Sequence, residues 1–207
     1  MKLIDRSVTD LLAAFRSSDP TPGGGSASAL AGAIGASLLA MVARIPKART
    51  ATGEDAERLQ AAGSRCEALS DELAVLVDRD SDAYDLVMAA YRKPKATDAE
   101  KTARGAAIQD ALKAAIAAPL AVMRAAAAAA EQAGVVARYG NPSASSDVEV
   151  ALELLGAALR GAKLNVEINL SSVKDADYAA RVREEACEFE RAAAHDANAA
   201  RAALTSS

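Results

Sequence analysis

The stretch DPTPGGGSASALAGAIGASLLAMV, from Asp19 to Val42, joins a glycine loop to a long apolar run and indicates how the chain folds. The run 27–43 has no charged residue and few large side chains. Within it, small residues recur every fourth position and form a ridge along one helical face: Ser28, Gly32, Ala36, Ala40. Because such a ridge lets a second helix approach closely, we expect the central helix of a bundle, buried nearly all round.

The loop before this helix consists of Pro22, Gly23, Gly24 and Gly25, followed by Ser26. Consecutive glycines at a helix start leave backbone N–H groups uncovered, and the helix dipole adds partial positive charge there. The structural alternative is a tight turn that needs glycine dihedrals, although one glycine usually satisfies a turn. The pattern therefore favours a loop that contacts an anionic or electron-rich group of a ligand.

The composition favours an all-α fold, because alanine is the most abundant residue, β-branched residues are sparse and aromatic residues make up only 3%. A chain of 207 residues is long enough for one domain, 1–207, with its own core. Start and stop signals predict a bundle of about six helices, several of them long. They cover residues 7–17, 25 or 26–44, about 52–91, 97–132, 146–170 and 175–204. Ser7 with Asp10 resembles a capping box, Thr97 with Glu100 forms another, and Ser146 is the expected cap of the fifth helix.

Charge and cysteine content exclude several classes of protein. The 24 basic and 28 acidic residues are scattered and no aromatic platform accompanies them, so we expect no nucleic-acid partner. The run 27–43 is shorter than the roughly 20 residues of a spanning helix, so burial in protein is favoured over a membrane. Cys66 and Cys187 lack a CxxC partner, and Asp5 and Arg6 interrupt the start of the chain before any apolar run. We therefore expect a cytoplasmic protein with reduced thiols.

One carboxylate falls on an apolar stripe of the third predicted helix. Spacings of four and three residues place Asp80 in line with six side chains that suit burial: Leu69, Leu73, Leu76, Tyr84, Val87, Tyr91. A carboxylate that faces a core must be paired or hydrogen-bonded, or its pKa shifts. Asp80 is therefore a candidate general acid or base, and an ion pair across the bundle is the equal alternative.

Asn165 and Asn169 lie four residues apart and share a face of the fifth predicted helix, near which we also group Asn141 and Asp147. Asn is unfavourable inside helices, and the two amides could hydrogen-bond a flat heterocycle; a buried polar network is the alternative. The only histidine, His195, lies in a charged helix where we expect it to be exposed. We therefore expect no metal site.

Three separated motifs resemble, in order, those of the cyclodeaminase/cyclohydrolase family of folate enzymes. They are PTPGGGS at 20–26, DSDAYDLVMAAYRKPK at 80–95 and GNPSASSDVEVALELLGAALRGAKLNVEINL at 140–170. The chain departs from the family after the second helix, where IPKARTATGED at 45–55 replaces a Gly-Lys-Lys-type segment with a tyrosine.

The resemblance implies an all-helical homodimer that binds a tetrahydrofolate derivative, with no cofactor beyond that substrate. The loop from Gly23 to Ser26, with Pro22, would contact the substrate, and Asp80 would be the acid/base group. The remaining motif positions would hold the pterin or the reacting bridge: Asp147, Asn141, Asn165, Asn169. Lys47, Arg49 or Lys95 would meet the anionic glutamate tail.

Two reactions fit the resemblance. One is hydrolysis of 5,10-methenyltetrahydrofolate to 10-formyltetrahydrofolate; the other is cyclisation of 5-formiminotetrahydrofolate with loss of ammonia. Because no formiminotransferase domain accompanies the chain, we favour the cyclohydrolase. A non-catalytic dimeric folate-binding or scaffold bundle is the alternative of another class, although a scaffold needs neither the glycine loop nor Asp80.

Overall fold

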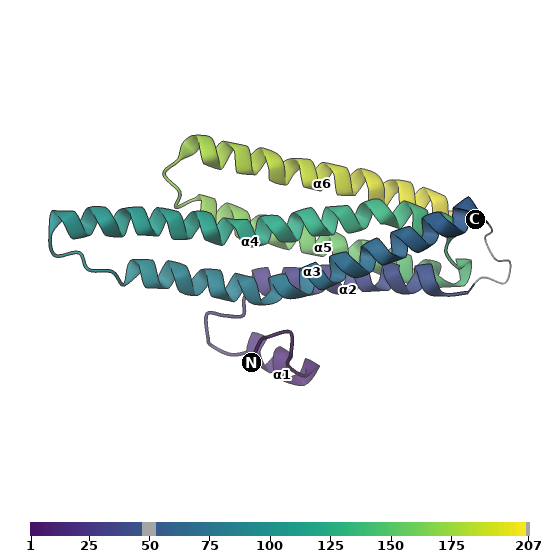
Figure 1. The fold of residues 1–207 in the computed structure, drawn as a ribbon, viewed down its shortest axis with the longest axis horizontal. Helices are drawn as coiled ribbons and strands as arrows, with labels where there is room; N and C mark the ends of the chain where they lie inside the picture. Colours follow the sequence, from purple (N-terminus) through teal and green to yellow (C-terminus); the bar gives the residue numbers. More distant parts are fainter. Residues whose placement is uncertain (47–52, 206–207) are drawn as a thin grey trace.

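The computed structural model describes residues 1–46 and 53–205, and every regular element in that part of the chain is helical (Figure 1). This confirms the predicted all-α bundle. The elements are α1 Val8–Phe15, α2 Gly24–Arg44, α3 Glu54–Tyr91, α4 Asp98–Tyr139, the short 3-10 turn η1 Pro142–Ala144, α5 Ser145–Leu170 and α6 Ala176–Thr205.

Four long helices form a ring, in which α2 packs between α3 and α5, and α4 closes the ring on the far side. The sixth helix, α6, lies against α4 and α5, so it covers one side of the ring and leaves α2 and α3 uncovered (Figure 1). The short helix α1 lies outside the ring, on the side of α2 and α3 (Figure 1). The N-terminal segment is tied to α3, because the Leu3 N–H donates to Asp78 Oδ1 at 2.6 Å.

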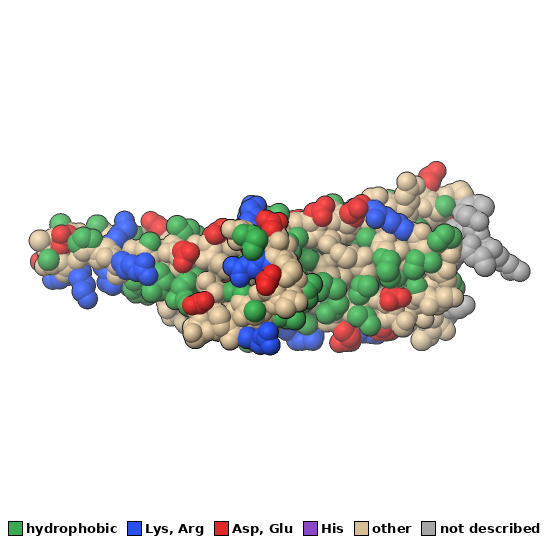
Figure 2. Space-filling view, turned by 90° about the horizontal axis from the view of Figure 1, so that it is seen from below, with side chains coloured by type: hydrophobic (Ala, Val, Ile, Leu, Met, Phe, Trp, Pro, Cys, Tyr) green, Lys and Arg blue, Asp and Glu red, His purple; other side chains and the backbone are tan. Residues whose placement is uncertain are grey.

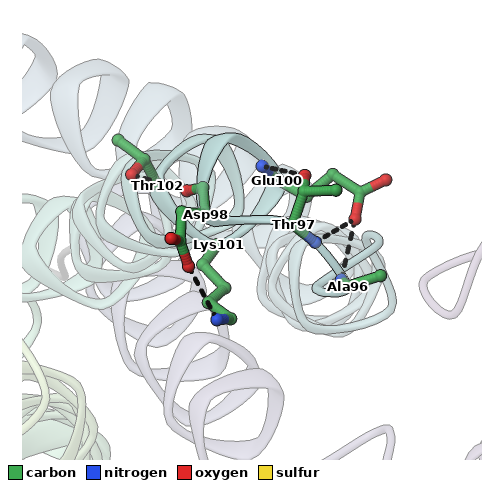
Figure 3. A network of polar contacts seen from close by, with 6 residues as sticks. All are labelled: Ala96, Thr97, Asp98, Glu100, Lys101 and Thr102. Carbon is green, nitrogen blue, oxygen red and sulfur yellow. Dashed lines mark hydrogen bonds and ion pairs between the residues drawn. The ribbon is translucent and has the colours of Figure 1, made fainter.

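Side-chain caps set the starts of α1 and α4, as the sequence predicts, whereas α2, α3 and α5 begin without a side-chain cap hydrogen bond. The Ser7 side chain accepts a hydrogen bond from the Asp10 N–H at 3.2 Å at the start of α1. At the start of α4, Thr97 and Glu100 form a complete capping box (Figure 3). Each such box satisfies two backbone N–H groups that the helix leaves without partners.

Two predicted helix limits are wrong. Ser146 does not cap α5, because η1 comes first and Asn141 caps that turn instead. The α4 helix does not end near 132 but continues to Tyr139. Ala133 and Val136 are 0% and 1% exposed. Core packing therefore extends the helix past Gly134, where local propensity alone favours an end.

The small-residue ridge of α2 is buried as predicted, with Gly32 against Ala158 and Leu73. The prediction that α2 is buried nearly all round is wrong, because Ile34 is 46% and Met41 40% exposed. Both α2 and α4 are apolar and long enough to resemble membrane spans, but 56% and 61% of their apolar windows are buried inside the bundle. Such burial is typical of core helices.

Replacing Gly35 with Ala should destabilise the bundle. A methyl carbon there would lie 3.0 Å from the Ala151 carbonyl oxygen and 3.0 Å from Leu155 Cγ. Because a backbone oxygen cannot turn away, we expect the free energy of unfolding in urea to fall by about 1–3 kcal/mol. Gly134→Ala is the matched control: nothing lies within 4 Å of the position that its methyl carbon would take, so we expect a gain of up to about 1 kcal/mol. Equal effects of the two substitutions would contradict close α2–α5 packing.

Candidate functional site

Asp80 lies on α3 and its carboxylate meets the first turn of α2. The Ser26 N–H donates to Asp80 Oδ2 at 3.1 Å. The Ser26 hydroxyl donates to the Val77 carbonyl at 2.8 Å and lies 3.5 Å from the same Oδ2. Ser26 itself is fully buried. One serine therefore fixes α2 to α3 and orients the carboxylate.

The glycines of the loop create the space that Asp80 occupies. A methyl carbon on Gly25 would lie 2.1 Å from Asp80 Oδ1, a distance that no real contact allows. On the other side of the loop, a methyl carbon on Gly24 would lie 3.4 Å from Asn165 Nδ2. The loop thus lies between α3 and α5, and we refer to Gly24, Gly25, Ser26, Asp80 and Asn165 as the Asp80 cluster.

Burial raises the pKa of Asp80 above its ordinary value of 3.8, and the two hydrogen bonds from Ser26 oppose this rise only in part. None of the ion pairs within the described part of the chain includes Asp80. The ion-pair alternative therefore has no support. A half-buried carboxylate with a raised pKa and no cationic partner is a candidate for proton transfer.

The anion that meets the α2 N-terminus is the protein's own carboxylate. We predicted that the bare N–H groups of the glycine loop would face an anionic or electron-rich group of a ligand. Asp80 accepts the Ser26 N–H, and the positive end of the α2 dipole stabilises its ionised form. The loop and the acid/base candidate are thus one unit, and the Thr21–Pro22 peptide that leads into it is cis.

The predicted apolar stripe on α3 is buried or half-buried over most of its length. Leu69, Leu73 and Leu76 are buried, and Tyr84 and Val87 are half-buried. Tyr91 is 44% exposed, so its predicted burial is wrong. The end of α3 runs past α2 together with α4 (Figure 1), and Tyr91 packs there under the Arg104 guanidinium.

The two asparagines of α5 lie at the same end of the bundle as Asp80. Asn165 Nδ2 donates to the Gly161 carbonyl at 2.9 Å, and Asn169 Nδ2 donates to the Ala115 carbonyl of α4 at 3.3 Å. Both residues are half-buried. Asn169 thus ties two helices together, as the polar-network alternative predicts, while Asn165 borders the glycine loop and can present its amide to a ligand.

Asn141 and Asp147 lie at the other end of α5. Eighteen residues separate Asp147 from Asn165 on one continuous helix, a rise of about 27 Å. Asn141 is engaged in its own loop, where Nδ2 donates to the Pro46 carbonyl at 2.7 Å and Oδ1 accepts the Ser143 N–H at 2.9 Å. Within one chain, the predicted site residues therefore form two separate groups.

Of the cations predicted to meet a glutamate tail, only Lys95 lies within the described residues, and it is not beside Asp80. Lys47 and Arg49 lie outside the described residues. Lys95 is exposed in the connection between α3 and α4, beyond the end of α3 at Tyr91. Tyr91 itself lies about 16 Å along the helix from Asp80.

His195 is exposed on α6, as expected. Among the described residues, no three His, Cys, Asp or Glu side chains gather as a metal site would require.

Sequence reasoning missed a cavity of about 290 Å³ beside the glycine loop. Pro22, Arg6 and Ser81 all line it, and α1 flanks it through Ala14. Arg6 Nε and Ser81 Oγ are buried without a hydrogen-bond partner in the described structure. Ser81 follows Asp80 directly in the sequence, so its position next to the candidate acid/base group could have been predicted. Only the fold places Arg6 in the same cavity.

Comparisons with known proteins agree on one family. A family model described as formiminotransferase-cyclodeaminase matches residues 7–188. A methenyltetrahydrofolate cyclohydrolase of Methylorubrum extorquens is 39% identical over 175 residues, which are 84% of each chain. The formimidoyltransferase-cyclodeaminase of Sus scrofa is 36% identical over 167 residues, 79% of this chain but only 30% of that protein.

A solved structure extends the likeness to the whole fold. The crystal structure of a formiminotetrahydrofolate cyclodeaminase from Thermotoga maritima superposes with a TM-score of 0.86 at 26% sequence identity. The alignment covers 98% of this chain and 97% of that one. The arrangement of helices around Asp80 is therefore shared by a protein of nearly the same extent.

Proposed function

This chain belongs to the formiminotransferase-cyclodeaminase family, and on that premise we propose that it hydrolyses 5,10-methenyltetrahydrofolate to 10-formyltetrahydrofolate. The observation that carries the proposal is Asp80, a half-buried carboxylate with a raised pKa, held by Ser26 against a glycine loop. The cyclohydrolase relative supports this reaction, because the match extends over 84% of both chains.

The substrate carries a delocalised cation across the carbon that bridges N5 and N10. The Asp80 carboxylate stabilises that cation and takes a proton as the oxygen of water bonds to the bridging carbon. The product of this step is a neutral tetrahedral carbon that carries a hydroxyl group. The bond from this carbon to N5 then breaks, N5 receives a proton and the hydroxyl proton leaves. The formyl group remains on N10.

The neighbours of Asp80 prepare it for this chemistry. Ser26 holds Oδ2 through its N–H, so the other oxygen, Oδ1, is the one that can accept the proton. Gly25 has no side chain to displace that oxygen. Asn165, on the other side of the loop, is placed to hydrogen-bond a flat ring that carries donors and acceptors. All of these groups belong to the protein, and we propose that no metal or cofactor beyond the folate takes part.

Cyclodeamination is the second candidate, favoured by the fold match to a formiminotetrahydrofolate cyclodeaminase. In that reaction N10 attacks the formimino carbon, and the amino nitrogen leaves as ammonia once protonated. It also passes through a tetrahedral carbon between two nitrogens, so the same acid/base group suffices. The chain spans about a third of the length of the mammalian relatives, 30% of the porcine protein and 34% of the rat protein.

We also propose that the protein acts as a homodimer in the cytoplasm. Cys66 is buried and Cys187 is half-buried, and both thiols are free; burial raises the pKa of Cys66 to about 12. Such an unreactive thiol suits a reducing compartment. A non-catalytic folate-binding or scaffold bundle is the alternative, and it would have no need of a desolvated carboxylate.

The test is to supply both folates to the purified protein. We expect 5,10-methenyltetrahydrofolate to be consumed at a rate well above that of its uncatalysed hydrolysis, as monitored by the decrease in its absorbance. We expect no ammonia to be released from 5-formiminotetrahydrofolate. Release of ammonia instead would assign the cyclodeaminase. If reduced folates raise the melting temperature but neither compound is turned over, the result would support a non-catalytic folate-binding bundle. No change in melting temperature would favour a scaffold.

A further inference from the structure

Two serines are the only buried polar side chains among the described residues, and both lie near the start of α2. Ser26 is fully buried and Ser28 is 7% exposed. Charged side chains of both signs, by contrast, are spread over the outer face of the molecule that carries α1 (Figure 2). Because burying a hydroxyl costs free energy unless it is hydrogen-bonded, each serine must have a partner inside the bundle.

The two serines face different helices. Positions two apart on an α-helix differ in direction by about 200°, so Ser26 and Ser28 point to nearly opposite sides of α2. Ser26 meets α3, where it donates to the Val77 carbonyl and holds Asp80. Ser28 meets α5, because a methyl carbon on Gly161 would lie 2.3 Å from its Oγ. The start of α2 is thus in contact with both of its neighbours.

Ser28 links the glycine loop to Asn165 through a closed set of contacts. Its hydroxyl donates to the Gly24 carbonyl at 2.7 Å and fills the space left by the missing side chain of Gly161. The Gly161 carbonyl accepts a hydrogen bond from Asn165 Nδ2 at 2.9 Å. That nitrogen also lies 3.4 Å from the position that a methyl carbon on Gly24 would take. We refer to Gly24, Ser28, Gly161 and Asn165 as the Ser28 network.

Helix packing alone does not require a serine opposite a glycine. Alanine is the better helix former at both positions, because glycine is unfavourable inside a helix and serine competes with the backbone for hydrogen bonds. Alanine would also fit: a methyl carbon on Gly161 would lie 3.4 Å from Ser28 Cβ, an ordinary contact, so only the Ser28 hydroxyl excludes it. The pair is therefore less favourable for the fold than two alanines, which points to a role other than stability.

The first turn of α2 depends on such support. The helix begins at Gly24 without a side-chain cap hydrogen bond, and consecutive glycines restrict the backbone less than any other residue. Ser26 holds this turn to α3 through Asp80. The Ser28 hydroxyl holds it on the α5 side, through the Gly24 carbonyl. Without that hydroxyl, the glycine loop and the Asn165 amide would no longer keep a fixed spacing.

We propose that Ser28 and Gly161 are positioning residues, which fix the spacing between the glycine loop and the Asn165 amide where the flat ring of the substrate binds. The identity of that substrate rests on the proposed function. Asn165 uses Nδ2 on the Gly161 carbonyl, so Oδ1 remains to accept an N–H group at the edge of the ring. Asp80 is held separately, through Ser26. The Ser28 network should therefore control substrate affinity and leave the proton-transfer step unchanged.

The test is a double-mutant cycle of Ser28→Ala and Gly161→Ala, read from KM and kcat for methenyltetrahydrofolate. The first substitution removes the hydroxyl, and the second displaces it with a methyl group. We expect KM to rise about 10-fold in each single variant, the effect of losing one well-placed hydrogen bond. The double variant should also show a rise of about 10-fold rather than 100-fold, because all three lose the same contact. Neither kcat nor its acidic limb, which depends on Asp80, should change.

The melting temperature separates this role from a structural one. The double variant carries the better helix former at both positions and has no clash, so it should melt at the wild-type temperature or higher while its KM stays raised. The matched control combines Ser37→Ala with Gly134→Ala and should keep the wild-type KM. Ser37 is exposed on α2 and contacts Ser70 of α3, and nothing lies within 4 Å of a methyl carbon on Gly134.

Wild-type KM in the three variants overturns the proposal, and so does a KM effect that multiplies in the double variant or appears only with a large loss of melting temperature. If wild type does not turn over methenyltetrahydrofolate, the proposed function fails instead. The same cycle is then read from the dissociation constant of 5-formyltetrahydrofolate, measured by isothermal titration calorimetry. Binding that is about 10-fold weaker in each variant supports the Ser28 network. Equal binding by all, or no binding by wild type, overturns it.

Discussion

Replacing Asp80 with Asn is expected to lower kcat/KM for methenyltetrahydrofolate by about 10²- to 10⁴-fold, the range that a general base contributes. The amide has the same shape and can still accept the Ser26 N–H, which now lies 3.1 Å from Oδ2. It cannot take a proton from water or stabilise a cation by charge. The fold and the loop should therefore persist while the chemistry is lost.

The pH dependence should identify the same group. The base must be ionised, so wild-type activity should fall as pH is lowered through the pKa of Asp80, which burial raises above 3.8. The bound cation favours the carboxylate, so the acidic limb of kcat should lie at lower pH than that of kcat/KM. The residual activity of Asp80→Asn should lack this limb.

Stability should change in the opposite direction to activity. The raised pKa means that the folded state binds the Asp80 proton more tightly than the unfolded state does. The free energy of unfolding of wild type should therefore decline as pH rises from the ordinary value towards the raised one, and Asp80→Asn should lack this decline. At pH 7 we expect the variant to melt at the same temperature or higher.

Asp85→Asn is the control, because Asp85 lies five residues further along α3 and is exposed. It should match wild type in turnover, pH profile and melting temperature. A large loss of melting temperature in Asp80→Asn would show that the carboxylate serves the fold, and near-normal turnover by a folded protein would exclude it as the essential base.

Replacing Gly25 with Ala is expected to lower turnover about 100-fold, the cost of displacing a catalytic group by roughly 1 Å. The added methyl carbon would lie 2.1 Å from Asp80 Oδ1 and 2.3 Å from its Cγ. Both atoms belong to the end of a side chain that can rotate, so the carboxylate should yield rather than the helix. The Asp80 carboxylate would then lose its hydrogen bond from Ser26 and would no longer be oriented towards the substrate.

The measurement is kcat and KM together with the melting temperature. We expect kcat to fall and the melting temperature to change little. Gly105→Ala is the control, because nothing lies within 4 Å of a methyl carbon at that position on α4, and its turnover should equal that of wild type. Normal kcat in Gly25→Ala would mean that the position of the carboxylate does not limit the reaction.

Features that depend on neighbouring residues in the chain were predicted well. The helices, the Thr97–Glu100 capping box and the Ser7 cap all rest on contacts within one turn. The position of Asp80 on an apolar stripe also follows from helical spacing alone. The exposure of Tyr91 was not predicted, because α3 extends beyond α2 at that point and Tyr91 leaves the core. The end of α4 was not predicted either, because Ala133 and Val136 pack in the core and extend the helix.

The sequence by itself determined the helical elements, the small-residue ridge of α2 and the unusual placement of Asp80, because periodicity and capping act over three or four residues. Only the tertiary structure decided that Ser26, fifty-four positions away, holds Asp80, and that Gly25 makes room for it. It also left Ile34 and Met41 exposed on one side of α2. These features depend on which helix faces meet, and side-chain spacing along one helix does not specify its partner.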